Sequence, residues 1–177
     1  MFVDDPFLHA AVGATPLVQL KLIVPEGAAE VWVKLESGNP TGSYKDRMAV
    51  SVIGGALQRG DVGPGDRVVE YTGGSTGMAL AFVCARAGLR FTAVSSDAFS
   101  EVKLRAMAAY GAEVLVEPSD GGTITPELIA RMRDRALELA SGPGSFYADQ
   151  FGSADVRAGY APMGVEIAEQ TMGRVDV

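Results

Sequence analysis

The sequence predicts an α/β fold, a parallel sheet with flanking helices arranged in three layers. Two observations indicate it. Short apolar runs alternate with longer helical patterns over residues 67–140, and glycine ends the helical patterns at Gly60, Gly88 and Gly111. Such alternation is typical of βαβ units, whose right-handed crossovers join parallel strands. Ligands bind these sheets at the carboxyl ends of the strands, so we expect a site in the loops there.

The local pattern of apolar residues justifies each element in turn. Residues 15–20 and 30–36 are expected to be strands, the second because polar and apolar side chains alternate. A helix over 43–60 follows, since apolar side chains recur along it at helical spacing. The alternation then continues with strand 67–71, helix 76–87, strand 90–95, helix 99–110, strand 113–117 and a helix over 126–140 that Thr125 caps. Beyond a loop-rich stretch at 142–152 we expect a helix over 160–171 and a strand beginning at 174–177.

Composition limits the classes of partner and compartment. The 15 Lys and Arg against 22 Asp and Glu give a formal charge of −7, which argues against nucleic acid and anionic membranes as partners. No apolar run approaches the ~18 residues of a membrane span, and residues 1–10 lack the pattern of a signal peptide. A single Cys84 cannot form an internal disulfide, and one Cys with one His leaves no metal cluster. We therefore expect a cytoplasmic protein without a metal.

A lysine follows a turn-rich run at residues 37–47. Ser43 is expected to be the N-cap of the next helix, and Asp46 can accept a hydrogen bond from its backbone N–H. Lys45 then lies in the first turn, near the positive end of the helix dipole, where a cation is disfavoured. That position suits an amine that must at times be neutral, as a Schiff-base lysine must. The alternative is a solvated lysine just after a cap.

A second candidate site lies at 68–77, where a strand enters a Gly-rich turn at a helix N-terminus. Bare backbone amides, the helix dipole and two hydroxyls make this turn a cradle for an anion. It lacks the G-x-G-x-x-G spacing of dinucleotide sites and the Gly-Lys-Ser/Thr of a P-loop. The anion can therefore be the carboxylate of an amino acid as well as a phosphate. The alternative is a plain capped turn.

Together these segments resemble the pyridoxal-phosphate enzymes of the cysteine synthase group, which have fold type II. The resemblance rests on several segments in the expected order and covers nearly the whole chain. They are residues 13–18, 34–36, 39–47, 70–81, 149–151 and 164–171. It implies pyridoxal 5'-phosphate as the cofactor and a small-molecule amino acid as the substrate.

The resemblance also implies roles for individual residues. Lys45 forms the internal aldimine with the cofactor and then moves the α-proton of the substrate. The substrate carboxylate is enclosed by Thr72, Gly73, Gly74, Ser75 and Thr76, and Gln150 reaches the same group. Ser75, where the group usually has Asn, also approaches the cofactor. Gly73 stands where the group usually has Ser, and both departures bear on the choice of substrate.

The same resemblance implies a division into domains. Residues 1–38 correspond to the first strands of a larger cofactor domain, 39–147 to a smaller mobile domain, and 148–177 to the return into the larger one. The family's glycine-rich phosphate loop and the Ser or Thr at the pyridine nitrogen are not found in this sequence. Gly121 and Gly122 resemble that phosphate loop only superficially, because they precede Gln150, whereas the family's loop belongs to its second half. We interpret these two glycines as a helix-entry turn. The chain is therefore expected to be the first half of a catalyst that is a homodimer when intact.

The expected reaction is β-replacement on an activated serine through an aminoacrylate, with O-acetylserine and sulfide or a thiol giving cysteine or a relative. Two alternatives stay open. One is β-elimination by a relative of serine/threonine dehydratase, or the reaction of a threonine synthase-like enzyme. The other is a non-catalytic half-chain that binds a partner polypeptide. The residues do not decide the leaving group or the nucleophile.

Other side chains are assigned to packing or to solvent. Cys84 lies in an alanine-rich helical pattern and is expected to be a buried apolar residue, and Trp32 is expected to pack on its strand. Asp46 and Arg47 are expected to pair locally or to cap their helix, and the alternative for Arg47 is that it helps to fix the lysine loop. The charged residues at 131–138 are expected to form a solvated face with i,i+3 and i,i+4 pairs.

Overall fold

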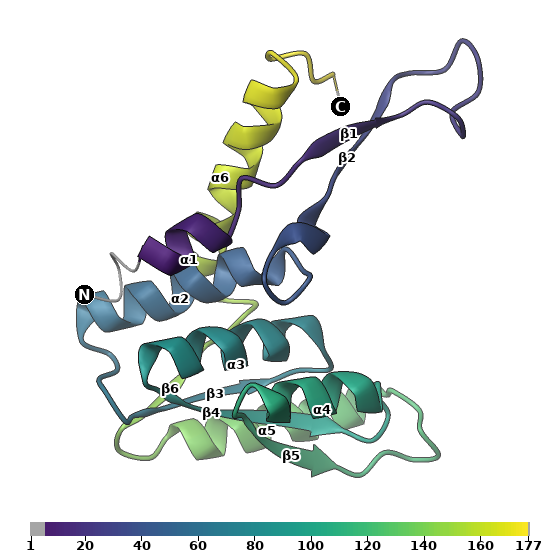
Figure 1. Cartoon of the computed structure of the whole chain (residues 1–177). Helices are drawn as coiled ribbons and strands as arrows, with labels where there is room; N and C mark the ends of the chain where they lie inside the picture. The colour runs from purple at the N-terminus through teal and green to yellow at the C-terminus, as the bar shows by residue number, and fades with distance from the viewer. Residues whose placement is uncertain (1–5, 177) are drawn as a thin grey trace.

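The computed structural model describes residues 6–176, and Figure 1 shows a layered α/β body from which a two-stranded ribbon projects. Four parallel strands form the central sheet in the order β5-β4-β3-β6. They are β3 (Arg67–Tyr71), β4 (Arg90–Ser96), β5 (Glu113–Glu117) and β6 (Ser145–Tyr147). The register pairs Arg67 with Arg90 on one side and with Ser145 on the other. The expected parallel α/β sheet is confirmed.

Helices cover both faces of this sheet, which confirms the three layers. On one face α5 (Pro126–Ala140) packs against β3, β4 and β6. On the other face lie α3 (Ser75–Ala87) and α4 (Glu101–Ala109). Outside them, α2 (Lys45–Arg59) packs on α3, and α6 (Ala154–Gln170) packs on α2 (Figure 1). The long α2 therefore connects the sheet to α6.

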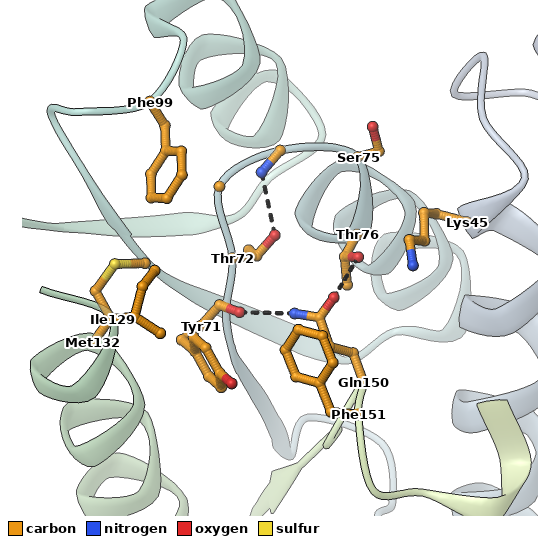
Figure 2. Close-up of a pocket in the computed structure, with 12 residues that line it drawn as sticks. Lys45, Tyr71, Thr72, Ser75, Thr76, Phe99, Ile129, Met132, Gln150 and Phe151 are labelled. Atoms are coloured by element: carbon orange, nitrogen blue, oxygen red, sulfur yellow. Dashed lines mark hydrogen bonds between the residues drawn. The ribbon is translucent and has the colours of Figure 1, made fainter. Parts of the chain in front are cut away.

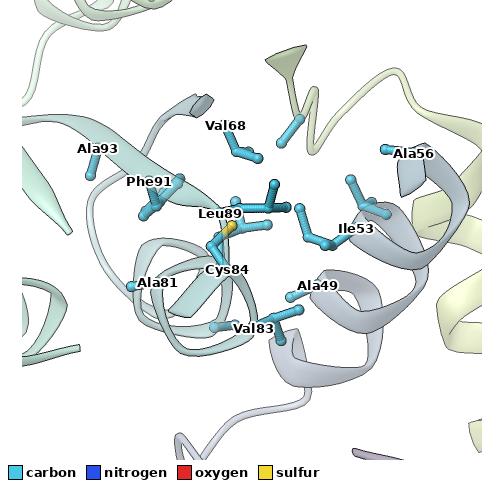
Figure 3. Close-up of a cluster of buried hydrophobic side chains, with 14 of the residues drawn as sticks. Ala49, Ile53, Ala56, Val68, Ala81, Val83, Cys84, Leu89, Phe91 and Ala93 are labelled. Carbon is cyan, nitrogen blue, oxygen red and sulfur yellow. The ribbon is translucent and has the colours of Figure 1, made fainter. Parts of the chain in front are cut away.

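Neighbouring side chains of β3 point into two separate cores. Val68 joins Ile53, Cys84 and Phe91 in the larger core, between the sheet and the pair α2–α3 (Figure 3). Val69 faces the smaller core under α5. Burial on both faces explains why two consecutive residues of this strand, Val68 and Val69, are apolar, as is usual in parallel sheets. Cys84 is fully buried as expected, and burial raises the pKa of its thiol.

The first part of the chain forms the projecting ribbon. Its strands β1 (Leu17–Leu20) and β2 (Val31–Lys34) pair with each other in antiparallel fashion. The short helix α1 (Pro6–Ala11) precedes them, and the 3₁₀ turn η1 (Glu36–Gly38) follows. Both expected strands exist, but they lie outside the parallel sheet. Trp32 is 39% exposed, so its expected packing is met only in part.

The last third of the chain departs from expectation. β6 falls in a stretch expected to be loop, because three residues are too few to show a pattern. α6 begins at Ala154 rather than at residue 160, and Ser153 caps it by accepting a hydrogen bond from the backbone N of Asp155 at 3.2 Å. Its Pro162 and two glycines weaken the helical pattern in sequence. Residues 174–176 form no strand, so that prediction is wrong there, and Val177 lies outside the described residues.

The entry to α2 is built differently from the expected capping box. Tyr44 occupies the N-cap position, and the Ser43 hydroxyl accepts a hydrogen bond from the backbone N of Lys45 at 3.2 Å. The carboxylate of Asp46 turns back to accept hydrogen bonds from the backbone N and the hydroxyl of Thr41. Asp46 therefore fixes the turn before the lysine instead of answering Ser43.

Within residues 6–176, no helix has both the length and the apolar character needed to cross a membrane. The expected domain limits (1–38, 39–147 and 148–177), the cytoplasmic location and the homodimer stay predictions.

Candidate active site

A cavity of about 320 Å³ opens at the carboxyl end of the parallel sheet (Figure 2). Its walls come from the start of α2, the loop between β3 and α3, the loop between β4 and α4, helix α5 and the segment after β6. All seven residues that the sequence predicts for the site line it: Lys45, Thr72, Gly73, Gly74, Ser75, Thr76 and Gln150. The structure thus brings together residues from three distant parts of the chain, while their roles stay predictions.

Lys45, the first residue of α2, presents its amine to the cavity. Its Nζ donates a hydrogen bond to the Tyr160 hydroxyl at 3.2 Å and lies 4.8 Å from the centre of the Tyr44 ring. Burial acts to lower the pKa of Lys45, but the hydrogen bond with Tyr160 and the phenol of Tyr44 outweigh it, so the pKa lies above its ordinary value. The amine is therefore charged at neutral pH and must lose a proton before it can act as a nucleophile.

The loop after β3 is held by its first threonine. The Thr72 hydroxyl accepts hydrogen bonds from the backbone N of Gly74 and of Gly77, each at 3.2 Å. Because a hydroxyl also carries one proton, Thr72 can still donate to a ligand. The loop leads directly into the N-terminus of α3 at Ser75, where the helix dipole favours an anion.

Two glycines of this region are fixed by their neighbours. A Cβ at Gly73 would lie 2.3 Å from Cε1 of Phe99, so the ring occupies the space that any side chain at 73 would need. A Cβ at Gly77 would lie 2.4 Å from the sulfur of Met107. Where the group usually has Ser, this chain has Gly73, and the ring of Phe99 fills the space that the serine side chain would occupy.

Gln150 closes the cavity from the segment after β6. Its Nε2 donates to the carbonyl oxygen of Tyr71 at 2.9 Å, and its Oε1 accepts from the Thr76 hydroxyl at 2.7 Å (Figure 2). These two bonds fix which end of the amide is the donor. The same side chain also acts on the buried carboxylate of Glu70, whose pKa it helps to lower.

A buried glutamate under the loop was not expected from the sequence. Glu70 is fully buried, and its two oxygens accept hydrogen bonds from the backbone N of Tyr71 and of Gln150, each at 2.9 Å. Burial raises the pKa of Glu70 to about 7, although both N–H donors act to lower it. The available signal was a charged residue inside an apolar strand directly before a glycine-rich turn.

Arg47 has distant partners, so its expected local pairing is wrong. Its Nε lies 2.7 Å from Glu36 Oε2, and its Nη1 lies 2.7 Å from Glu166 Oε1. The hydrogen bond from Arg47 holds the pKa of Glu166 at about 2, against the opposing effect of burial, and Lys34 adds to the lowering. This ionic network joins the start of α2 to η1, β2 and α6.

Several residues that line the cavity were not predicted as site residues from the sequence. An apolar wall is formed by Tyr71, Phe99, Ile129, Met132 and Phe151. Phe151 is 76% exposed, and its ring lies 5.9 Å from that of Tyr71, centre to centre. Figure 2 shows Phe99, Ile129 and Met132 across the loop from Lys45.

Comparison with known proteins gives a consistent result. Residues 8–177 match the family described as pyridoxal-phosphate dependent enzyme. Cysteine synthase B of Escherichia coli is 41% identical over 169 residues, which cover 95% of this chain and 54% of that protein. The crystal structure of O-ureido-L-serine synthase has a TM-score of 0.80 and 38% identity, covering 95% of this chain and 51% of that one. A hydrogen sulfide-producing enzyme from Fusobacterium nucleatum has a TM-score of 0.83 and 30% identity, with 96% and 54% covered. The chain spans about half the length of the curated relatives it matches.

Proposed function

The chain belongs to the family of pyridoxal-phosphate dependent enzymes, and from this premise we propose that it is part of an enzyme of β-replacement on an activated serine. The proposed substrates are O-acetylserine and sulfide or a thiol, which give cysteine or a relative. The observation that carries the proposal is a cavity shared by the Lys45 amine, the glycine-rich loop 72–76 and the amide of Gln150.

The residues of the cavity fit the cofactor. A primary amine, the side chain that can bond an aldehyde covalently, points into a space lined by a loop that leaves no room for a Cβ at Gly73. When bound, pyridoxal phosphate supplies an electron sink that stabilises the negative charge left on the substrate's Cα after proton loss. Lys45 and Ser75 are the residues we assign to it.

The loop and Gln150 are proposed to hold the substrate's carboxylate. The N-terminus of α3 and the Thr72 hydroxyl offer donors on one side. The amide of Gln150 lies on the other side, where the Thr76 hydroxyl holds it by donating to its Oε1. With the carboxylate fixed, the α-hydrogen can be turned toward Lys45. The amine of Lys45 then takes the α-proton at Nζ and becomes an ammonium, for which the Tyr160 oxygen is already in place.

Covalent trapping tests this proposal. The chain is incubated with pyridoxal phosphate, reduced with borohydride and mapped by mass spectrometry. We expect a cofactor-sized adduct on Lys45, and an absorbance band that responds to O-acetylserine. The side chain of Lys103 lies against Gly74 and serves as the neighbouring control, which we expect to stay unmodified. Equal labelling of both lysines, or no labelling, would contradict a cofactor site in this chain.

A second candidate is β-elimination, favoured by the similarity to an enzyme that produces hydrogen sulfide instead of consuming it. Both reactions begin with removal of the same α-proton, so the same cavity serves either. Product analysis on the full-length protein separates them. Keto acid and ammonia indicate elimination, whereas an amino acid that forms only with added thiol indicates replacement.

A further inference from the structure

Tyr160 reaches Lys45 from a helix far along the chain. Its hydroxyl accepts the hydrogen bond from Lys45 Nζ at 3.2 Å, and its ring centre lies 5.7 Å from the same atom. The Tyr44 ring lies 4.8 Å from Nζ on another side, and the two rings are 5.5 Å apart. The amine is therefore enclosed by two aromatic rings and bonded by one of their hydroxyls, an arrangement that stabilises a cation.

The backbone at Gly159 fixes this arrangement. A Cβ at 159 would lie 2.8 Å from the carbonyl oxygen of Arg47 and 2.9 Å from the Cα of Met48. These are backbone atoms of α2 that cannot move aside cheaply, so only glycine permits this approach of α6. The adjacent Tyr160 is placed at Lys45 by that contact, and the ion pair of Arg47 with Glu166 holds the same two helices together.

We infer that Tyr160 is a positioning residue for Lys45: its hydroxyl oxygen holds the ammonium in place and so controls when the amine is free to react. The catalytic meaning of this inference rests on the proposed function. The contact itself does not, because it involves only side chains of this chain. A free amine is needed both to bond the cofactor and to take the α-proton, so Tyr160 sets the pH range of both events.

The groups around the amine agree with this assignment. Among residues 6–176, the titratable groups that act on Lys45 are Tyr44, next to it in sequence, and Tyr160, from α6. Both raise the pKa of Lys45 against the effect of burial. Burial raises the pKa of Tyr160 as well, although Lys45 acts to lower it. At neutral pH the pair is therefore an ammonium and a neutral phenol. Removing the hydroxyl leaves burial less opposed and favours the free amine.

Trace acetylation of the lysines of the chain over a series of pH values tests the inference without cofactor. Isotopically labelled acetic anhydride is the probe, and labelling is measured for the Lys45 peptide by mass spectrometry relative to exposed Lys21. In Tyr160→Phe we expect the midpoint of the Lys45 profile to fall by about one pH unit. At neutral pH this corresponds to about tenfold faster labelling of Lys45.

Two further variants keep the test decisive. Tyr110→Phe removes a hydroxyl from a ring that packs edge-on against Phe82, away from the cavity, and we expect it to leave the Lys45 profile unchanged. Gly159→Ala separates α6 from α2 and should shift the profile in the same direction as Tyr160→Phe. A Lys45 midpoint that is the same in wild type and Tyr160→Phe overturns the inference. Failure of the cofactor adduct alone overturns the proposed function and leaves this one standing, because acetylation needs no cofactor.

Discussion

At the scale of single residues, the ring of Phe99 occupies the space that a side chain at position 73 would need, so this position requires glycine. Since a Cβ there would lie 2.3 Å from the ring, Gly73→Ala forces either the ring or the loop to move. We expect the free energy of unfolding to fall by about 1–3 kcal/mol, the usual range for an overpacked site. Urea unfolding followed by circular dichroism measures the loss.

Replacing Phe99 as well shows whether the loss of stability in Gly73→Ala comes from the clash with the Phe99 ring or from a general effect of the added methyl group. In Gly73→Ala with Phe99→Ala, the cost should be smaller than the sum of the two single costs by about 0.5–3 kcal/mol. Gly54→Ala is a matched control, because nothing lies within 4 Å of a Cβ there, inside α2. It should gain about 0.5–1 kcal/mol from helix propensity. Strictly additive costs in the double variant would argue against the contact.

At the scale of elements, Glu70 joins the ends of strands β3 and β6. Its two oxygens accept one backbone N–H from each side of the joint, from Tyr71 and from Gln150. Only a carboxylate can do this with both oxygens, since the amide of glutamine has a single acceptor and would turn its NH₂ toward the other N–H. The position of Gln150 in the cavity thus depends on the charge state of a buried group.

This joint predicts a pH dependence of stability with a definite sign. The pKa of Glu70 is raised from 4.5 to about 7 in the folded chain, so the folded state binds the proton more tightly than the unfolded one. Its contribution to the free energy of unfolding is therefore greatest below pH ~4.5 and falls by up to about 3 kcal/mol as pH rises to ~7. Urea unfolding at pH 5, 6, 7 and 8 should show this slope in wild type and a reduced slope in Glu70→Gln. As a control, Glu138→Gln, at an exposed position, should show the same pH slope as wild type. An unaltered slope in Glu70→Gln would refute the assignment of this pH dependence to Glu70.

The same elements explain how far sequence reasoning reaches. Lys45 and the loop 72–76 could be predicted because each is a local pattern, a turn before a helix and a turn after a strand. Tyr160 and Glu166 could not, because their partners on α2 lie 115 and 119 residues away and only the packing of α6 on α2 brings them together. β6 was not predicted because three residues are too few to show a period. The helix expected over 160–171 was confirmed as part of α6, but its start at Ala154 was missed because glycine and proline interrupt the helical pattern.

At the scale of the whole molecule, the ribbon β1–β2 leaves one face uncovered. The register pairs Val18 with Val33 and Leu20 with Val31, so these four apolar side chains share one face of a two-stranded sheet. Three of them, Val18, Val31 and Val33, are between 37% and 43% exposed. A two-stranded sheet is rarely stable alone in water, and a continuous apolar face of this kind is uncommon on a monomer.

We therefore expect the 177-residue chain on its own to self-associate through the ribbon. Val31→Lys with Val33→Lys places charges on the exposed face without disturbing the sheet core, because neither side chain belongs to it. Sedimentation velocity over a tenfold range of concentration should show wild type growing in mass while the double variant stays closer to 18.4 kDa. Val102→Lys, on the exposed side of α4, adds a charge elsewhere and should associate as wild type does. A wild-type chain that sediments as a monomer at every concentration and unfolds cooperatively would contradict association through the ribbon and show that these 177 residues fold as an independent unit.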